Sequence, residues 1–235
     1  MSATPTAPYT PRIRPPGAPL VVAIDGPAAS GKSSTAQWVA QRLGFLHVDS
    51  GSLYRAATAA MLEREEDVTR WTEDAVLAAV REVTLEPAGG VSFAPCLRGV
   101  ELGEAIRGAA VTQHVSRVAQ MPRVREWVNA QVRAAADRRN VVVDGRDIGT
   151  VVFPDADLKI FLVADPWERA RRRLIQRLGR APTDEEIAEE TERLVQRDAR
   201  DATQTVQAKD AVLIDTTYLT QEEQVERIVA LARVL

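Results

Sequence analysis

The stretch that decides the fold reads Gly26-Pro27-Ala28-Ala29-Ser30-Gly31-Lys32-Ser33, and it matches the phosphate-binding pattern G-x-x-x-x-G-K-[ST]. It directly follows the apolar residues 20–24, an order that predicts a strand, then a loop, then a helix. Glycines in such a loop let backbone N–H groups turn inward around a polyphosphate. The lysine reaches the β- and γ-phosphates, and the serine hydroxyl ligates magnesium. The loop therefore predicts a site for ATP or GTP with Mg²⁺.

The residues after the loop support this interpretation. Apolar residues recur there at the spacing of one helix face, namely Ala36, Val39, Ala40 and Leu43. Gly44 follows them as a C-terminal stop. A glycine-rich turn that binds no ligand is the structural alternative, and the flanking strand and helix disfavour it.

Composition limits the possible functions. The 235 residues suffice for one domain with an insertion or for two small domains, and 45% apolar with 27% charged residues is typical of a globular protein. A net charge of −3 disfavours non-specific nucleic-acid binding, which requires a basic surplus. One cysteine, Cys96, excludes an internal disulfide, and two histidines offer no cluster for structural zinc. We therefore expect a reducing, cytoplasmic location and no nucleic-acid partner.

The N-terminal segment, residues 1–19, contains six prolines and lacks the apolar stretch of a signal peptide. No run in the chain approaches the ~18 apolar residues of a membrane span, so no membrane association is expected. We interpret the segment as a flexible tail. A proline-rich docking segment is the alternative.

Short apolar runs alternate with helical patterns along the rest of the chain. The runs predict strands buried on both faces, at residues 21–24, 45–48, 141–143, 158–163 and 212–214. The helical patterns cover residues 32–43, 53–63, 112–136, 166–178, 184–197 and 221–234. This alternation predicts an α/β fold, a P-loop NTPase-type parallel sheet flanked by helices.

Two regions depart from the alternation. One holds three short strand-like pieces that predict a small inserted antiparallel sheet, at residues 83–86, 89–93 and 96–101. In the other, residues 169–180 carry six arginines, and residues 184–192 are mostly acidic. This second region predicts either a helical hairpin with ion pairs or a mobile, phosphate-sensing lid.

Charged residues follow two of the predicted strands. Arg55 lies one helical turn beyond the end of the second strand, and Arg146 and Asp147 come just after the third. Ligands of open α/β sheets bind at this edge. Arg197 and Arg200 follow the acidic helix. Phosphoryl transfer between two anions needs charge neutralisation, so these arginines indicate a second, anionic substrate, although each one taken singly is also explained by a surface ion pair.

Several longer motifs are more specific than the phosphate loop. They are Ile24-Asp25-Gly26-Pro27, Asp49-Ser50-Gly51 with Leu53-Tyr54-Arg55, Ile106-Arg107 with Val115-Ser116-Arg117-Val118-Ala119, Pro122-Arg123-Val124-Arg125, DGRDIGTVVFPDA at residues 144–156, and Arg197-Asp198 with Asp201. With these motifs the chain resembles the bacterial cytidylate kinases over residues 20–234. Members of that family are nucleoside monophosphate kinases that move the γ-phosphoryl group of ATP onto CMP or dCMP.

The resemblance implies a role for each matching residue. The ATP phosphates would be held by Gly26, Pro27, Ala28, Ala29, Ser30, Gly31, Lys32, Ser33 and Ser34, with Ser33 as the magnesium ligand. The cytosine would be surrounded by Ser50, Ser116, Arg125 and Asp147. The monophosphate would be gripped by Arg55 and Arg146, while Arg197 and Asp201 approach the sugar and the transferring phosphate. Lys32, Arg146 and Arg197 would be the catalytic residues.

The same resemblance implies a domain organisation. The kinase domain would span residues 20–235, with its core at 20–70 and 110–235, a monophosphate-binding insertion at about 71–109 and a short helical lid at about 169–200. Its partners would be the small molecules CMP and dCMP, and we expect a monomer. One departure from the family is Gln204, which stands where another arginine usually contacts the acceptor phosphate.

Alternatives remain from the residues alone. A GTPase switch would use an N-K-x-D element, but Asn129 and Asn140 precede Ala and Val. An adenylate kinase usually shows D-G-x-P-R where this chain has Asp144-Gly145-Arg146-Asp147. A shikimate kinase would use a glycine triplet, and only Gly89-Gly90 occurs.

Overall fold

The computed structural model describes residues 17–235, and its centre is a five-stranded parallel sheet in the order β2-β6-β1-β7-β8. The strands are β1 Val21–Asp25, β2 Leu46–Asp49, β6 Val141–Gly145, β7 Leu158–Val163 and β8 Val212–Asp215. All neighbouring pairs run parallel. The predicted parallel sheet flanked by helices is confirmed, and the carboxyl ends of its strands meet at one edge.

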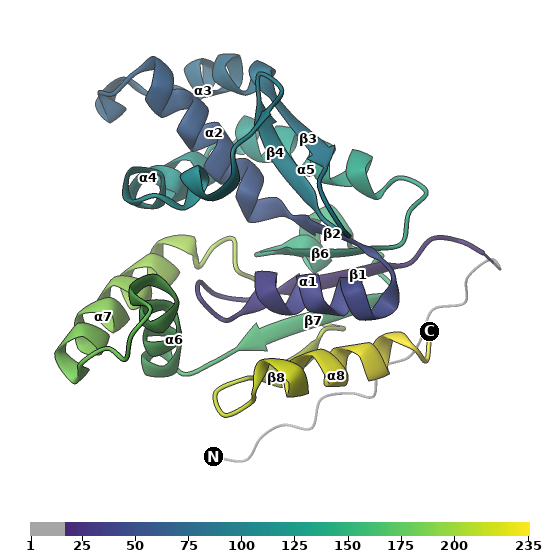
Figure 1. The fold of residues 1–235 in the computed structure, drawn as a ribbon. Helices are drawn as coiled ribbons and strands as arrows, with labels where there is room; N and C mark the ends of the chain where they lie inside the picture. The colour runs from purple at the N-terminus through teal and green to yellow at the C-terminus, as the bar shows by residue number, and fades with distance from the viewer. Residues whose placement is uncertain (1–16) are drawn as a thin grey trace.

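Helices cover both faces of this sheet (Figure 1). One layer contains α1 Lys32–Leu43 and α8 Gln221–Ala232, which pack on Val22 and Ile24 of β1. The other contains α2 Ser50–Arg64 and α5 Pro122–Ala136, which pack on the side of Ala23. Because successive side chains of a strand point to opposite faces, a strand covered on both sides is apolar throughout.

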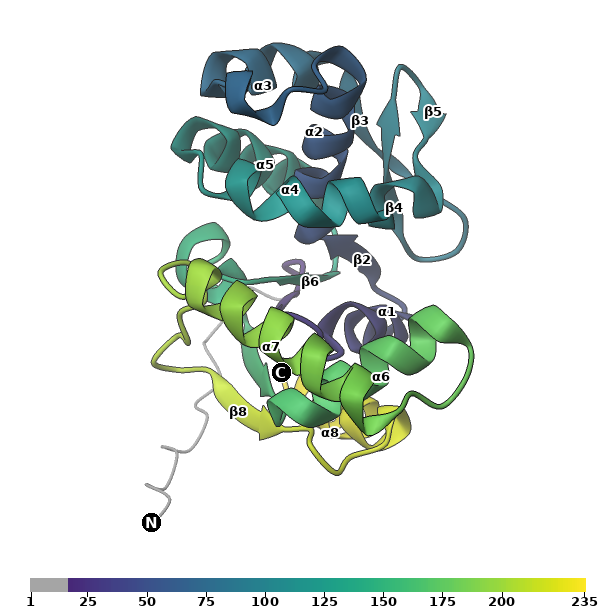
Figure 2. The same ribbon diagram turned by 90° about the vertical axis from the view of Figure 1, so that its left-hand side faces the viewer.

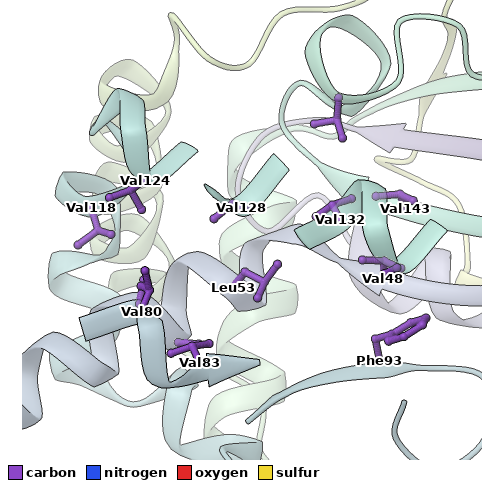
Figure 3. Packing of buried hydrophobic residues seen from close by; sticks show 14 of the residues in the cluster. Val48, Leu53, Val80, Val83, Phe93, Val118, Val124, Val128, Val132 and Val143 are labelled. Atoms are coloured by element: carbon purple, nitrogen blue, oxygen red, sulfur yellow. The ribbon is translucent and has the colours of Figure 1, made fainter. Parts of the chain in front are cut away.

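The second layer is the larger of the two cores. On α5, Val124, Val128 and Val132 recur every four residues and share one buried face, as Figure 3 shows. Val48 of β2 and Val143 of β6 belong to the same cluster. Burying one valine in this way stabilises the fold by about 1.5–3 kcal/mol.

The remaining elements form two groups on either side of the phosphate-loop edge (Figure 2). The upper group adds α3 Glu73–Ala79, α4 Ala109–Ala119 and a three-stranded antiparallel sheet of β3 Val83–Pro87, β4 Phe93–Leu97 and β5 Val100–Glu101. Short helical turns lie at η1 Val68–Arg70, η2 Val80–Glu82, η3 Gly103–Arg107 and η4 Ile148–Val152. The lower group is the helical hairpin of α6 Pro166–Leu178 and α7 Asp184–Asp201.

The prediction of one helix over residues 112–136 is wrong, because the structure has two helices there. The first ends at Ala119, and the second begins with Pro122 at its first position. Met121 between them has an extended backbone (φ −77°, ψ 115°). Proline lacks the N–H that would continue the first helix, and it disfavours a helical conformation for the residue before it.

The small antiparallel sheet is confirmed, but its strand limits differ from the prediction. Residues 89–92 form the turn before β4, with Gly90 at φ 77°. The piece at 96–101 contains a second turn, in which Arg98 and Gly99 have φ angles of 52° and 78°. Positive φ angles end a strand, so this piece divides into the end of β4 and the short β5.

Within residues 17–235, no helix is both long enough and apolar enough to cross a membrane.

Candidate active site

The phosphate loop joins β1 to α1 at the carboxyl edge of the sheet, as the sequence predicted. Gly26 has φ 150°, and a Cβ atom there would lie 2.2 Å from the carbonyl oxygen of Leu162. Only glycine fits that close approach. Gly31 has φ 88° and forms the N-cap of α1, so the loop ends at a helix N-terminus. The partial positive charge of that terminus favours an anion.

Lys32 lies buried at the first position of α1. Its Nζ donates to the carbonyl oxygen of Pro27 at 2.9 Å. Burial, together with the nearby Arg146, lowers the pKa of Lys32 to about 7, against the attraction of Asp144. A polyanion that binds beside this buried lysine stabilises its charged form.

Ser33 is the first member of a chain of polar contacts across the sheet edge. Its Oγ donates to Asp144 Oδ2 at 2.6 Å, and Asp144 Oδ1 lies 2.8 Å from His47 Nε2. Burial by itself would raise the pKa of Asp144, but the hydrogen bonds from His47 and Ser33 lower it. Asp144 therefore stays ionised beside the loop.

The pair of Ser33 and Asp144 fits Mg²⁺. A hydroxyl and a carboxylate are hard oxygen donors, and Mg²⁺ is usually held by one or two carboxylates together with substrate phosphates. In the described part of the chain, no group of three or more His, Cys, Asp or Glu side chains is arranged to hold a metal. Water and phosphate oxygens would supply the other ligands of magnesium at this position. The sequence assigned no role to Asp144 or His47, although Asp144 lies next to a predicted strand end.

Arg146 and Arg197 converge on Asp201 from two elements. Asp201 Oδ2 lies 3.6 Å from Arg146 Nη2 and 3.6 Å from Arg197 Nε. Among residues 17–235, the Nε atoms of both arginines are buried and have no hydrogen-bond partner. Burial, together with repulsion from Arg146, lowers the pKa of Arg197 to about 10. Two buried N–H donors without acceptors mark a place where an anion binds favourably.

Arg55 belongs to the same cationic region. Its Nη1 donates to the carbonyl oxygen of Ile106 at 3.2 Å and to Thr112 Oγ1 at 3.0 Å. Burial lowers the pKa of Arg55. Repulsion from nearby cations, Arg146 among them, lowers it as well. Arg55 therefore connects α2 to η3 and to the first turn of α4.

Arg125 and Asp147 form an ion pair between α5 and the end of β6. Arg125 also donates to the carbonyl oxygen of Ala119 at 3.1 Å and to Gln204 Oε1 at 3.0 Å. The exposed Arg200 donates instead to the carbonyl oxygen of Gln196, so it does not take the place of an arginine at position 204.

The two predicted serines differ in their surroundings. Ser50 is buried at the start of α2, and its Oγ donates to the carbonyl oxygen of Asp144 at 2.8 Å. Its hydroxyl can therefore accept a further hydrogen bond, while its one proton is already used. Ser116 is buried on α4.

The α6–α7 hairpin contacts the phosphate loop at Ala28. Asp198 Oδ1 accepts from the backbone N–H of Ala28 at 3.1 Å, and Arg169 Nη1 donates to the Ala28 carbonyl oxygen at 2.8 Å and to Asp198 Oδ2 at 2.6 Å. Ala28 also packs in a small apolar cluster with Ala170 and Leu174. The sequence did not reveal these contacts, because Arg169 and Asp198 look like any other charged residues of the two helices.

A phosphate loop after the first strand of a parallel sheet, opposed by buried arginines at the same edge, defines a P-loop phosphotransferase. Comparison with known sequences narrows the class. The family model "Cytidylate kinase" matches residues 22–234. A cytidylate kinase of Limosilactobacillus fermentum is 43% identical over 214 residues, which cover 89% of this chain and 93% of that protein. One from Geobacillus kaustophilus is 44% identical over 216 residues, covering 89% and 94%.

The chain therefore belongs to the cytidylate kinase family, and it is a kinase. The resemblance predicted from the sequence motifs is confirmed. The alternatives of a GTPase switch, an adenylate kinase and a shikimate kinase are set aside.

Proposed function

We propose that this kinase transfers the γ-phosphoryl group of ATP to CMP or dCMP, giving ADP and CDP or dCDP. Membership of the cytidylate kinase family supports the choice of substrates. The observation that carries the proposal is the pair of buried Nε donors on Arg146 and Arg197, which make no hydrogen bond within the described residues and lie at the strand edge of the phosphate loop. An acceptor phosphate supplies the missing acceptors.

The phosphate loop from Gly26 to Ser34 holds the triphosphate in this proposal. Its backbone N–H groups and the Lys32 ammonium contact the phosphate oxygens. Ser33, next to Asp144, would hold Mg²⁺, which would supply positive charge to stabilise the phosphates. The low pKa of Lys32, about 7 because of burial, rises when the polyanion is present, so Lys32 is a cation in the loaded enzyme.

The acceptor is held by two sets of side chains. Arg55, Arg146 and Arg197 bind its phosphate, with Asp201 orienting the last two. Ser50, Ser116, Arg125 and Asp147 surround the base, and the Asp147 carboxylate accepts from the exocyclic amine of cytosine. Uracil has a carbonyl oxygen at that position, so the same carboxylate disfavours UMP.

The reaction is a direct in-line transfer. A phosphate oxygen of CMP attacks the γ-phosphorus, and Lys32 with the arginines stabilises the charge on the equatorial oxygens. No general base is required, because a monophosphate is largely ionised at neutral pH. Catalysis then consists of positioning and charge neutralisation.

The domain roles follow from the same proposal. Residues 71–109 enlarge the monophosphate-binding side, and residues 169–200 act as a lid whose closure excludes water from the γ-phosphate. We expect the enzyme to act as a monomer. The single cysteine supports a cytoplasmic enzyme. Most of the predicted tail, residues 1–16, lies outside the described residues.

ADP formation from Mg-ATP tests the proposal directly. CMP, dCMP, UMP, AMP and shikimate are offered separately, together with a control without acceptor. We expect strong turnover with CMP or dCMP and little with the others. Turnover confined to AMP or shikimate would refute the acceptor assignment, and hydrolysis indifferent to every acceptor would refute transfer to a second substrate.

A further inference from the structure

Asp25 is a buried carboxylate at the end of β1, with 3% of its surface exposed. The roles proposed so far make no use of it. Its Oδ1 accepts from the backbone N–H of Ile148 at 2.8 Å, and its Oδ2 accepts from the backbone N–H of Gly149 at 2.8 Å. One side chain thus holds two consecutive amides that lie 123 and 124 residues away in the sequence.

These two amides begin the turn η4, directly after Arg146 and Asp147. The carbonyl oxygen of Asp147 accepts from the N–H of Val151 at 2.8 Å, so the turn is tied back to Asp147. In the sheet, Asp25 lies opposite Gly145. The strand register and the carboxylate together determine the direction in which Arg146 and Asp147 leave β6.

The residue after Asp25 is Gly26, the first residue of the phosphate loop. A Cβ atom at Gly26 would lie 2.2 Å from the Leu162 carbonyl oxygen, so the loop begins pressed closely against β7. Asp25 is therefore attached rigidly to the loop proposed for ATP through its backbone. Through its side chain it holds the segment proposed for the acceptor.

We infer that Asp25 is a positioning residue whose carboxylate holds the Arg146–Asp147 segment in place against the phosphate loop, and that it thereby sets affinity and base selectivity for the monophosphate. This inference rests on the proposed function. Asp25 reaches the substrate only through the η4 backbone.

The energetics of Asp25 are consistent with this role. Burial and the charge of Asp147 raise its pKa to about 6, even though the N–H groups of Gly149 and Ile148 act in the opposite direction. An ionised carboxylate at this position is therefore costly for stability. Costs of this kind are concentrated at functional sites.

The test is Asp25→Asn in the full chain. An asparagine offers one oxygen acceptor, and its NH₂ group opposes the other backbone N–H. With a hydrogen bond to a charged acceptor lost, we expect kcat/KM for CMP to fall about 10- to 100-fold, with KM for ATP changing less than about threefold. The preference for CMP over UMP should shrink as well. Asp157→Asn is the matched control, because Asp157 Oδ2 accepts from the Val21 N–H at the opposite end of β1.

Gly149→Ala provides a second route to the same effect. A Cβ atom there would lie 3.1 Å from Lys159 Cδ and in ordinary contact, at 3.4 Å, with Asp25 Oδ2, so it crowds the turn mainly against Lys159 while leaving the carboxylate in place. It should reproduce the loss that is selective for CMP. Equal losses for ATP and CMP in Asp25→Asn, or wild-type kinetics in that variant, would overturn the inference.

Hydrogen exchange of the Ile148 and Gly149 amides in the substrate-free protein separates this inference from the proposed function. Both amides should exchange faster in Asp25→Asn than in the wild type and in Asp157→Asn. Unchanged exchange would overturn the inference even if the wild type phosphorylates CMP. A wild type that does not phosphorylate CMP would instead refute the proposed function.

Discussion

Arg125 donates to acceptors from three parts of the chain: the Ala119 carbonyl oxygen, Gln204 Oε1 and the Asp147 carboxylate. Because guanidinium N–H groups only donate, it must be the oxygen of the Gln204 amide that faces Arg125. The uncharged Gln204, which stands where the family usually has an arginine, therefore accepts a hydrogen bond from Arg125. Gln204 orients the arginine that we propose to face the base.

Replacing Gln204 by leucine removes this acceptor at nearly constant size. We expect kcat/KM for CMP to fall by about tenfold, since one hydrogen bond to a charged donor is lost. Steady-state kinetics with CMP and dCMP measure the effect. The exposed Gln207→Leu is the control, and equal kinetics in the two variants would contradict the role given to Gln204.

Lys32→Ala tests the donor side at the same scale. The substitution removes the ammonium that we propose to stabilise the transferring phosphoryl group, so kcat should fall by about 100-fold or more. The comparison is with Lys209→Ala, an exposed lysine that should retain wild-type turnover. Wild-type turnover in Lys32→Ala would show that the loop does not act as proposed.

At the scale of secondary structure, the α6–α7 hairpin depends on Glu190. This glutamate is 3% exposed, and it pairs with Arg173 at 3.0 Å, Arg177 at 3.4 Å and Arg193 at 3.4 Å. Thr183 begins α7 with a capping box to Glu186. The arginine-rich and acidic segments thus form the helical hairpin with ion pairs that was one of the two predictions. The lid motion stays a proposal.

Glu190→Gln should destabilise the protein by about 2 kcal/mol, because it removes the charge on which three guanidinium groups converge. The three arginines remain partly exposed, and hydration limits the loss. Urea unfolding at neutral pH measures it. Glu189→Gln, one residue away and largely exposed, should cost less than about 0.5 kcal/mol. Similar values for the two variants would contradict the central role of Glu190.

At the scale of the whole molecule, the stability of this fold includes the cost of charges buried at the sheet edge. Burial is the main cause that raises the pKa of Asp25 and lowers the pKa of Lys32, so it favours the neutral form of each side chain. The cost is balanced by apolar cores on both faces of the sheet. The site is therefore built at the expense of stability.

The pH dependence of unfolding reveals this cost. The pKa of Asp25 rises from 3.8 to about 6 on folding, so the folded state binds the extra proton. Its contribution to stability is full below 3.8 and is lost as the pH rises through about 6. Relative to Asp25→Asn, the wild type should lose roughly 2.4 kcal/mol between pH 4 and pH 7. Urea unfolding of both proteins at the two pH values measures the difference, and a difference independent of pH would contradict it.

The sequence by itself determined the parallel sheet, the phosphate loop and the family. Strand and helix periods are local, and the eight residues from Gly26 to Ser33 must lie together wherever the chain goes. Parallel strands also bring Arg55, Arg146 and Asp147 to one edge, because each follows a strand at its carboxyl end. The single long helix predicted over residues 112–136 was wrong, because Pro122 begins a second helix there.

The tertiary structure alone decided which side chains meet. The order β2-β6-β1-β7-β8 places Asp144 between His47 and Ser33, and it brings Asp25 to the amides of Ile148 and Gly149. These partners come from distant parts of the sequence, and their side chains carry no periodic signal. Contacts of this kind follow from the packing of whole elements, because a hydrogen bond across the sheet forms only after the strands between its partners are in register.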